Sequence, residues 1–576
     1  MSPHHRVPAS PRPRVTPSPR PRVPASPRHR VTPSPFMKHF LLVLTFSVGV
    51  MLLMSVGYRH GSIPVASAAA AAPAFNWAKT WGGSTAKVSA KSADIDATGN
   101  VYVAGEFSGT VHFDPTGTNP KGTITSNNGT VDAFLSKFDA NGQFLWVRTW
   151  GCGTSGNMNF GYGRDAANGV GLDAAGNAYV IGLYQSTVNF GSGIVATSNA
   201  PAGHNNIFLA RFAPDGTTQW VRTWGGAWGG EGYSVAVDPV RGAVYAEGDW
   251  STVPDRGTVD FNPAGPTHDL HTNHGFYDSF LSKYDLNGNF QWARTWGGEG
   301  YDDGPGVAVD TAGNVYVGGM YGSQQINFDP AGGSAGLGHP ATNTGNTVLY
   351  VDVFLSKFDT NGIFQWVRTW GGLNAGGKGT VNAGEVVATD GADGVYIVGR
   401  FGCATCNFNA EPTGNPDPHT SHGDADAFIS KYDVNGHFIW AKTWGGIGAD
   451  GANSATVDGA HNVYVSGIIS ATVDLGGGPV TSHGLLDASL STFAADGTFQ
   501  SAQTWGGSGN DYGLGVTLNR VGTIYTFGSF QNTVNMNPSG GIDQHTAAGV
   551  EDAYLSKFAD TPVLFDQHLY VPLIRR

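Results

Sequence analysis

Acidic and tyrosine side chains follow a recurring Trp-Gly-Gly motif, and they are the set in this sequence best suited to chemistry. Carboxylate oxygens and Tyr hydroxyls can together hold a cation such as calcium, a sugar or a basic peptide segment. Two carboxyl groups about 5–9.5 Å apart could also act as acid and base on a polysaccharide. The plainer interpretation is a solvated acidic rim. The candidates are Glu231, Tyr233, Tyr301, Asp302, Asp303, Asp450, Asp511 and Tyr512.

Cysteine and histidine offer two further candidates for redox or metal chemistry. Cys403 and Cys406 have the spacing of a redox pair or of half a four-sulfur metal site, but the chain has three cysteines and no second pair. A local disulfide that leaves Cys152 free therefore fits better. A cluster of three histidines could bind a metal, but a related stretch at His419 and His422 indicates an ordinary repeat loop. The three are His268, His271 and His274.

The repeated stretch Trp-Val-Arg-Thr-Trp places two aromatic rings and a cation at alternate positions. In a strand these three side chains lie on one face, where an Arg can stack on an aromatic ring. The stretch could be an aromatic ligand platform, or it could pack one repeat unit against the next. Its presence in nearly every unit favours packing. Representative positions are Trp146, Arg148, Trp150, Trp366, Arg368 and Trp370.

Seven copies of this stretch, spaced 61 to 74 residues apart, make the chain an array of one structural unit. Each unit contains four segments with strand periodicity, for example residues 306–310, 315–319, 353–359 and 364–370. An Asn-Gly turn at Asn361 predicts a hairpin between the last two. The Asp at turns such as Asp310 could suggest calcium, but a side chain bonded to its own turn explains it better. We therefore predict an all-β, seven-bladed β-propeller of four-stranded antiparallel blades.

The two ends of the array predict how the ring closes. Residues 75–81 read as a fourth strand without a blade of its own, and residues 552–558 read as a third strand that lacks a fourth. Pairing them would complete the last blade and cover its exposed edge. Inserts between the second and third strands contain short strand-like pieces, and the sequence leaves open whether these form a fifth strand.

The repeats resemble a known family. The runs Asp-Ala-Phe-Leu-Ser-Lys-Phe-Asp-x-Asn-Gly, Thr-Trp-Gly-Gly and Val-Ala-Val-Asp-x-Ala-Gly-Asn-Val-Tyr-Val-x-Gly are similar to the SBBP repeat of bacterial secreted and surface proteins. The resemblance covers roughly residues 77–558. It implies a bacterial, extracytoplasmic β-propeller, and it implies no catalytic motif.

The remaining segments indicate where the protein is located, and the net charge limits which partners it can bind. Residues 1–36 are Pro- and Arg-rich repeats, either disordered or upstream of a true start at Met37. Residues 37–74 read as a signal peptide with an Ala-rich cleavage region or as a membrane anchor, residues 75–559 as the propeller, and residues 560–576 as a tail. Beyond residue 74 the chain has 23 Lys and Arg against 44 Asp and Glu, a net charge of −21, which disfavours nucleic acid.

These observations predict a secreted or cell-surface propeller that acts as a non-enzymatic binding or adhesion scaffold. Its partner would be a protein or a glycan at the cell exterior, and it would meet a membrane only through an uncleaved N-terminal segment. We expect no cofactor, calcium being the one ion that the carboxylates would suit. The alternative is an extracytoplasmic enzyme that acts on polysaccharide through the same carboxylates.

Overall fold

The computed structural model describes residues 72–152, 163–201, 203–226, 228–252, 257–330, 351–372, 382–411 and 414–558. These residues lie within one compact unit, Ala68–Arg576. The predicted disordered repeats, most of the predicted signal segment and the predicted tail lie outside the described residues.

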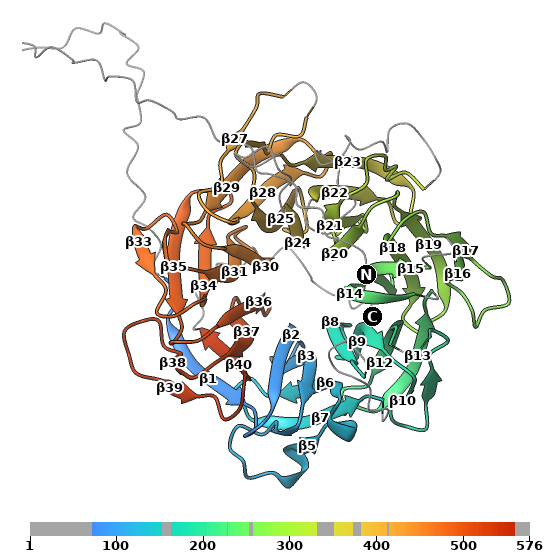
Figure 1. Cartoon of the computed structure of the whole chain (residues 1–576), viewed down its shortest axis with the longest axis horizontal. Helices are drawn as coiled ribbons and strands as arrows, with labels where there is room; N and C mark the ends of the chain where they lie inside the picture. Colours follow the sequence, from blue (N-terminus) through green and yellow to red (C-terminus); the bar gives the residue numbers. More distant parts are fainter. Residues whose placement is uncertain are drawn as a thin grey trace, which may run out of the picture. The chain divides into compact units, whose positions relative to one another are not determined.

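Seven four-stranded antiparallel sheets are arranged in a ring, which confirms the predicted propeller (Figure 1). The innermost strands, which contact one another in sequence around the axis, are β2 (Lys87–Ile95), β8 (Ala166–Leu172), β14 (Gly229–Asp238), β20 (Asp302–Val309), β24 (Ala383–Thr389), β30 (Gly451–Val457) and β36 (Tyr512–Leu518). The second strands are β3 (Val101–Ser108), β9 (Ala178–Tyr184), β15 (Ala243–Ser251), β21 (Val315–Tyr321), β25 (Gly394–Phe401), β31 (Val463–Ile469) and β37 (Ile524–Phe530).

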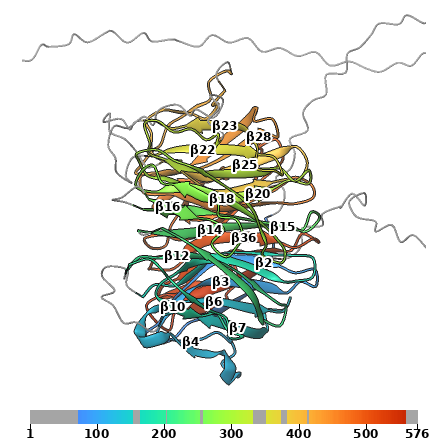
Figure 2. The same ribbon diagram turned by 90° about the vertical axis from the view of Figure 1, so that its right-hand side faces the viewer.

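The outer half of each blade is a hairpin. The third strands are β6 (Val131–Phe138), β12 (Asn206–Phe212), β18 (Asp278–Asp285), β22 (Asp352–Phe358), β28 (Asp426–Asp433), β34 (Asp487–Phe493) and β40 (Asp552–Phe558). The outer strands are β7 (Phe144–Trp150), β13 (Thr218–Trp224), β19 (Phe290–Trp296), β23 (Phe364–Trp370), β29 (Phe438–Trp444), β35 (Phe499–Trp505) and β1 (Phe75–Trp81). Viewed at right angles, the strands run across the thickness of the ring (Figure 2).

The ring closes as predicted, because β1 is the outer strand of the seventh blade. It pairs antiparallel with β40, with Trp81 opposite Ala553. The first strand of the propeller therefore pairs with its last strand, and the edge of β40 is covered.

The inserts form separate hairpins and do not add a fifth strand to any described blade. In six blades the segment between the second and third strands contains its own two-stranded sheet. These hairpins are β4 (Thr110–His112) with β5 (Thr123–Thr125), β10 (Thr187–Asn189) with β11 (Val195–Thr197), β16 (Thr258–Asp260) with β17 (Leu270–Thr272), β26 (Cys406–Asn407) with β27 (Pro418–His419), β32 (Thr472–Asp474) with β33 (Pro479–Thr481), and β38 (Thr533–Asn535) with β39 (Gln544–Thr546).

The hydrophobic core lies between neighbouring blades. Trp150 at the end of one outer strand stacks on Phe212 of the next blade at 5.3 Å between ring centroids, and it also contacts Phe190 and Phe208. Because every sheet buries both faces this way, each blade depends on its two neighbours. The described residues contain two short 3₁₀ turns, Pro120–Gly122 and Asn127–Gly129, and within them no helix has the length and apolar character needed to cross a membrane.

Candidate functional site

A cavity of about 470 Å³ lies on the axis of the ring. It is lined by the innermost strands of all seven blades, mostly through small and polar side chains such as Ser92, Asn168, Ser234 and Ser454. We call this cavity the axial channel. Among the described residues of its wall, the charged ones are Lys91, Arg164 and Glu231, in the sector formed by the first three blades.

The charges in the first two blades of this wall neutralise one another. Lys91 and Arg164 each contact the same oxygen of Glu106, at 3.0 Å in both cases. The Arg164 guanidinium also reaches Glu231 Oε1 at 3.2 Å, and the Asn205 amide donates to that oxygen. Burial lowers the pKa of Lys91, and Glu106 counteracts part of this effect. A chain of alternating charge therefore runs from the first blade to the third.

A second cavity of about 110 Å³ shares Glu231 and Tyr233 with the axial channel, and we call it the side pocket. Aromatic rings dominate its wall. His204 lies 4.9 Å from Trp228, and Tyr277 lies 4.8 Å from Tyr301, between ring centroids. The remaining lining residues include Asp249 and the backbone of the segment that begins β14.

Three buried carboxyl groups lie at and behind the side pocket, and we call them the acidic cluster. They are Glu247 and Asp249 on one face of β15, and Asp303 on β20 of the next blade. Asp249 accepts the backbone N–H of Glu231 at 3.0 Å and the Tyr233 hydroxyl at 3.2 Å. Both carboxylate oxygens of Glu247, and Oδ1 of Asp303, have no hydrogen-bond partner among the described residues.

The environment disfavours the charged form of all three groups. Burial, followed by repulsion from neighbouring carboxylates, raises the pKa of Glu247 and of Asp249 well above the ordinary range. The same causes raise the pKa of Asp303 to about 8. No Lys, Arg or His of the described chain forms an ion pair with any of the three. A positive charge brought to this cluster would therefore be strongly favoured.

The structure brings four of the eight predicted acidic and tyrosine residues to this region. Glu231, Tyr233 and Tyr301 line the side pocket, and Asp303 lies behind it. They meet because β14 and β20 are neighbouring innermost strands.

The other four lie outside both cavities, because their side chains serve the loops or the innermost strand itself. Asp302 accepts the backbone N–H of Gly298 and the Ser323 hydroxyl, at 2.8 and 2.6 Å. Equivalent bonds link Asp450 to the N–H groups of Gly446 and Ser470, and link Asp511 to those of Gly507 and Gln531. Tyr512 is the first residue of β36, and its carbonyl accepts the Tyr554 hydroxyl.

Several residues of the site were not predicted from the sequence, although a signal was present. Each second strand contains a Gly at the same position of the repeat. The residue after this Gly is apolar in three blades, but it is Glu106, Asp249 and Arg400 in three others. The alternation of apolar positions in those strands does not reveal these charged residues. His204, Trp228 and Tyr277 come from loops that carry no repeat signal.

The Trp-Val-Arg-Thr-Trp stretch packs between blades. Arg148 lies 5.3 Å from the ring of Trp146 and donates to the carbonyl of Gly216 in the next blade, and Arg368 does the same with Trp366 and Gly436. The second Trp of each stretch is buried between the sheets. In the two stretches described here these residues are Trp150 and Trp370.

The cysteines and histidines have separate partners. Cys403 and Cys406 form a disulfide, and Cys152 is a buried free thiol. The three clustered histidines do not converge, since His268 contacts Asp260, His271 contacts Thr295 and His274 contacts Asp278. His419 makes the equivalent contact in the fifth blade, where its Nδ1 lies 2.9 Å from the hydroxyl of Thr443 on the outer strand.

Comparisons with known proteins bear on the fold. The family model for the SBBP beta-propeller repeat matches residues 291–320. The chain is 25% identical over 177 residues to a WD repeat-containing protein of Acanthamoeba polyphaga mimivirus, which is 31% of this chain and 12% of that protein. It is 30% identical over 187 residues to regulatory protein FlaEY of Caulobacter vibrioides, which is 31% of this chain and 18% of that protein. The chain thus spans less than a fifth of either relative.

Among solved structures, the chain is similar to the extracellular domain of a hybrid two-component system of B. thetaiotaomicron. The identity is 9%, the match covers 84% of this chain and 82% of that one, and the TM-score is 0.13. A likeness at this level carries no argument about function. The chain is therefore a seven-bladed β-propeller that contains a match to the SBBP beta-propeller repeat at residues 291–320.

Proposed function

We propose that this protein is a non-enzymatic binding propeller, secreted or displayed at the cell surface, whose side pocket receives a Lys or Arg side chain of a protein partner. The observation that carries the proposal is the acidic cluster, which has no counter-charge in the described chain and lies at and behind an aromatic-walled pocket. The extracytoplasmic location is supported by the apolar run from Phe40 to Val56 and the small residues that follow it.

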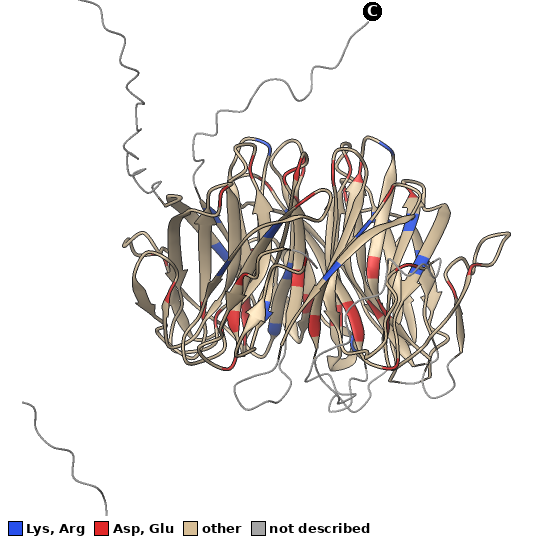
Figure 3. Ribbon diagram, turned by 90° about the horizontal axis from the view of Figure 1, so that it is seen from above, with Lys and Arg blue, Asp and Glu red and all other residues tan. Residues whose placement is uncertain are grey.

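The chemistry of the pocket favours a cation over a neutral sugar. Aromatic faces attract an ammonium or guanidinium group through the ring quadrupole, and Trp228 and Tyr301 supply such faces. Asp249 and Glu231 supply carboxylate oxygens for charge-assisted hydrogen bonds. A neutral sugar would supply no charge to favour the ionised form of the carboxyl groups. The overall excess of acidic residues, visible in red in Figure 3, would also draw a basic partner toward the ring.

An oligolysine peptide is a suitable test ligand, and Asp249→Asn is the test variant. Asn has nearly the shape of Asp, keeps an oxygen for the N–H of Glu231 and cannot ionise when a cation binds. We expect the variant to bind the peptide at least about tenfold more weakly in calorimetry, since hydrogen bonds to charged groups contribute about 1.5–3 kcal/mol. Asp424→Asn is the matched control, because Asp424 is an exposed carboxylate distant in sequence from the pocket.

Two results would overturn the proposal. The first is equal binding by the wild type and Asp249→Asn, which would reduce the interaction to the diffuse acidity of the surface. The second is turnover of a polysaccharide that is lost in Asp249→Asn. That result would replace the binding role with the enzymatic alternative, in which the raised carboxyl groups act as acid and base.

A further inference from the structure

The turns between the first and second strands follow one pattern in the first, second and fourth blades, and the other four blades depart from it. The usual turn begins with Asp and has Gly at its fourth position, as in Asp96 with Gly99 and Asp310 with Gly313. Those glycines have positive φ values of 85°. In the sixth blade the fourth position is His461, which keeps a positive φ of 62°. A side chain at this position adopts a backbone conformation that favours glycine.

The geometry of the second blade shows where a side chain at this position points. A Cβ added at Gly176 in the second blade would lie 3.7 Å from the Cβ of Asp96, the turn Asp of the preceding blade. The fourth turn position therefore faces the turn Asp of its neighbour. His461 fills this place, and its neighbour is Asp390 in the fifth blade.

The fifth blade is altered at the matching position. Its turn runs Asp390-Gly391-Ala392-Asp393-Gly394, so that the fourth position carries a second carboxylate and the usual Asn at the fifth position is absent. In other blades that Asn donates to the turn Asp, as Asn314 does to Asp310 at 2.7 Å. Asp390 has lost this donor.

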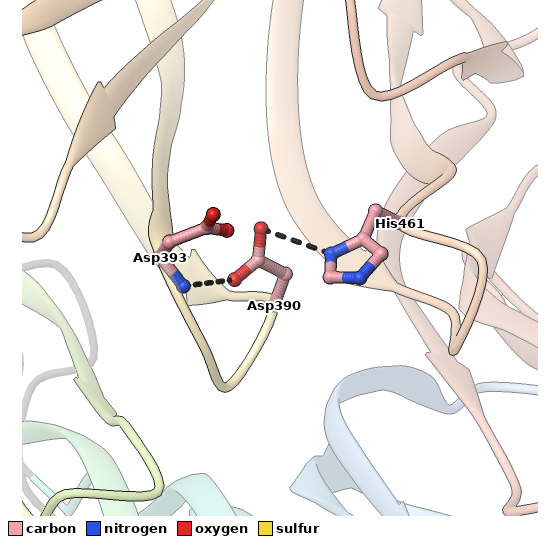
Figure 4. A group of neighbouring side chains, drawn as sticks. All are labelled: Asp390, Asp393 and His461. Atoms are coloured by element: carbon pink, nitrogen blue, oxygen red, sulfur yellow. Dashed lines mark hydrogen bonds and ion pairs between the residues drawn. The ribbon is translucent and has the colours of Figure 1, made fainter. Parts of the chain in front are cut away.

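Three metal-binding side chains meet as a result (Figure 4). Asp390 Oδ2 lies 3.2 Å from His461 Nδ1, and the ligand atoms of Asp390, Asp393 and His461 all lie within 4.8 Å of one another. The Asp390 side chain is fully buried, and the charged groups of the described chain that lie near its Oδ2 are His461 at 3.2 Å and Lys431 at 3.9 Å. Oδ1 is already used by three backbone N–H groups of its own turn.

We infer that Asp390, Asp393 and His461 form a binding site for a divalent transition metal ion of the zinc class, held between the fifth and sixth blades. A metal ion can bridge Oδ2 and an unprotonated Nδ1 in place of the hydrogen bond that a protonated Nδ1 would donate to the carboxylate. Two ligands each about 2.0–2.1 Å from zinc at the tetrahedral angle are separated by roughly 3.3 Å. The distance from Oδ2 to Nδ1 matches this separation. Three protein ligands leave the fourth position to water, since Asp393 is exposed.

The local charges allow such an ion. Lys431 is the nearest described cation, but its Nζ is 3.9 Å from Asp390 Oδ2 and donates to the carbonyl of Ala495. The equivalent Lys137 in the first blade lies closer to its turn Asp, at 3.3 Å from Asp96. Two carboxylates against one ammonium leave a net negative charge for the metal. The ion would join two turns that are 71 positions apart in the chain, and so would clamp two blades.

Zinc titration of the full-length protein, followed by calorimetry and thermal unfolding, tests the inference. His461→Gly is the main variant, because it restores the residue that the turn backbone favours and removes one ligand without risk to folding. We expect the wild type to bind one zinc ion more than His461→Gly does, and to gain a rise in melting temperature that the variant lacks. Asp393→Asn, a change at an exposed side chain, should weaken the same site at least about tenfold.

His437→Ala is the matched control. His437 also pairs with an Asp at the start of a turn, Asp433 at 2.9 Å, but no third ligand is grouped with it in the described residues. This variant should keep the additional zinc ion. Equal zinc binding by the wild type and His461→Gly would overturn the inference and leave an ion pair between a protonated His461 and Asp390. Loss of the additional ion in His437→Ala would also overturn it, because the ion would then lie elsewhere.

Discussion

At the scale of single residues, the acidic cluster destabilises the folded protein in the absence of a ligand. Glu247, Asp249 and Asp303 are buried beside one another, and ionising any of them opposes both the low dielectric of the interior and its neighbours. Buried groups with pKa values raised in this way are candidates for a functional site. In this chain they lie at and behind the pocket that we propose as the binding site.

The pH dependence of the stability of the Asp303→Asn variant tests this destabilisation directly. The pKa of Asp303 is about 8 in the folded protein and ordinary, near 4, when unfolded. Between these values the unfolded chain has released a proton that the folded chain still holds, so the wild type loses stability as the pH rises. The variant lacks this loss. We expect it to be more stable than the wild type at about pH 8 by on the order of 5 kcal/mol, with little advantage at about pH 4.

Urea unfolding at the two pH values provides the measurement, and Asp424→Asn controls for the loss of one surface charge. A stability difference between Asp303→Asn and the wild type that stays constant across this pH range would show that Asp303 titrates normally.

At the scale of elements, the outer strands hold the ring together. Trp370 ends β23 and is 2% exposed, and it packs against Phe408, Phe428 and Tyr432 of the following blade. Arg368 on the same strand stacks on Trp366 and donates to the backbone of that blade. Each repeat thus carries the surface that joins it to the next one.

Trp370→Ala should destabilise the protein by about 3–5 kcal/mol, because it removes a large buried side chain and leaves a cavity between two blades. Thermal or denaturant unfolding measures the loss. Ile439→Ala on the neighbouring outer strand β29 is the control, since Ile439 is 48% exposed and should change stability little. A loss for Trp370→Ala no larger than that of the control would contradict packing between blades as the role of the repeated Trp.

Much of the element level follows from the sequence, because repeated patterns report on shared contacts. The strands, the Asn-Gly hairpins and the pairing of residues 75–81 with the last blade are all readable from one unit compared with another. The insert hairpins were harder, since strands of three residues carry too little alternation to distinguish a hairpin from a fifth strand.

The candidate site could be predicted from the sequence only in part, because the direction of a side chain depends on the register of its strand. Glu231, Tyr233 and Tyr301 follow the Trp-Gly-Gly motif and do line the side pocket. Asp302 follows the same motif, but its side chain turns into the loop, because adjacent residues of a strand face opposite ways. Whether an Asp faces the channel or its own loop depends on register, and one residue of register reverses the answer.

At the scale of the whole molecule, the ring brings together groups that the sequence keeps apart. Inner strands from all seven blades surround the axial channel, yet the charges that matter come from the first four. Paired charges line the first two blades, and unpaired carboxyl groups collect at the third and fourth. This asymmetry gives a sevenfold repeat a single binding sector.

Proton release on binding is the most direct test of the central claim, that the side pocket receives a cation. A cation placed beside carboxyl groups with raised pKa values favours their ionised form, so binding should expel protons at neutral pH. Calorimetry of the oligolysine peptide in two buffers with different ionisation enthalpies measures the number released. We predict a release by the wild type that is markedly smaller in Asp249→Asn and in Asp303→Asn. Binding with no proton release, or with the same release in all three proteins, would contradict the account.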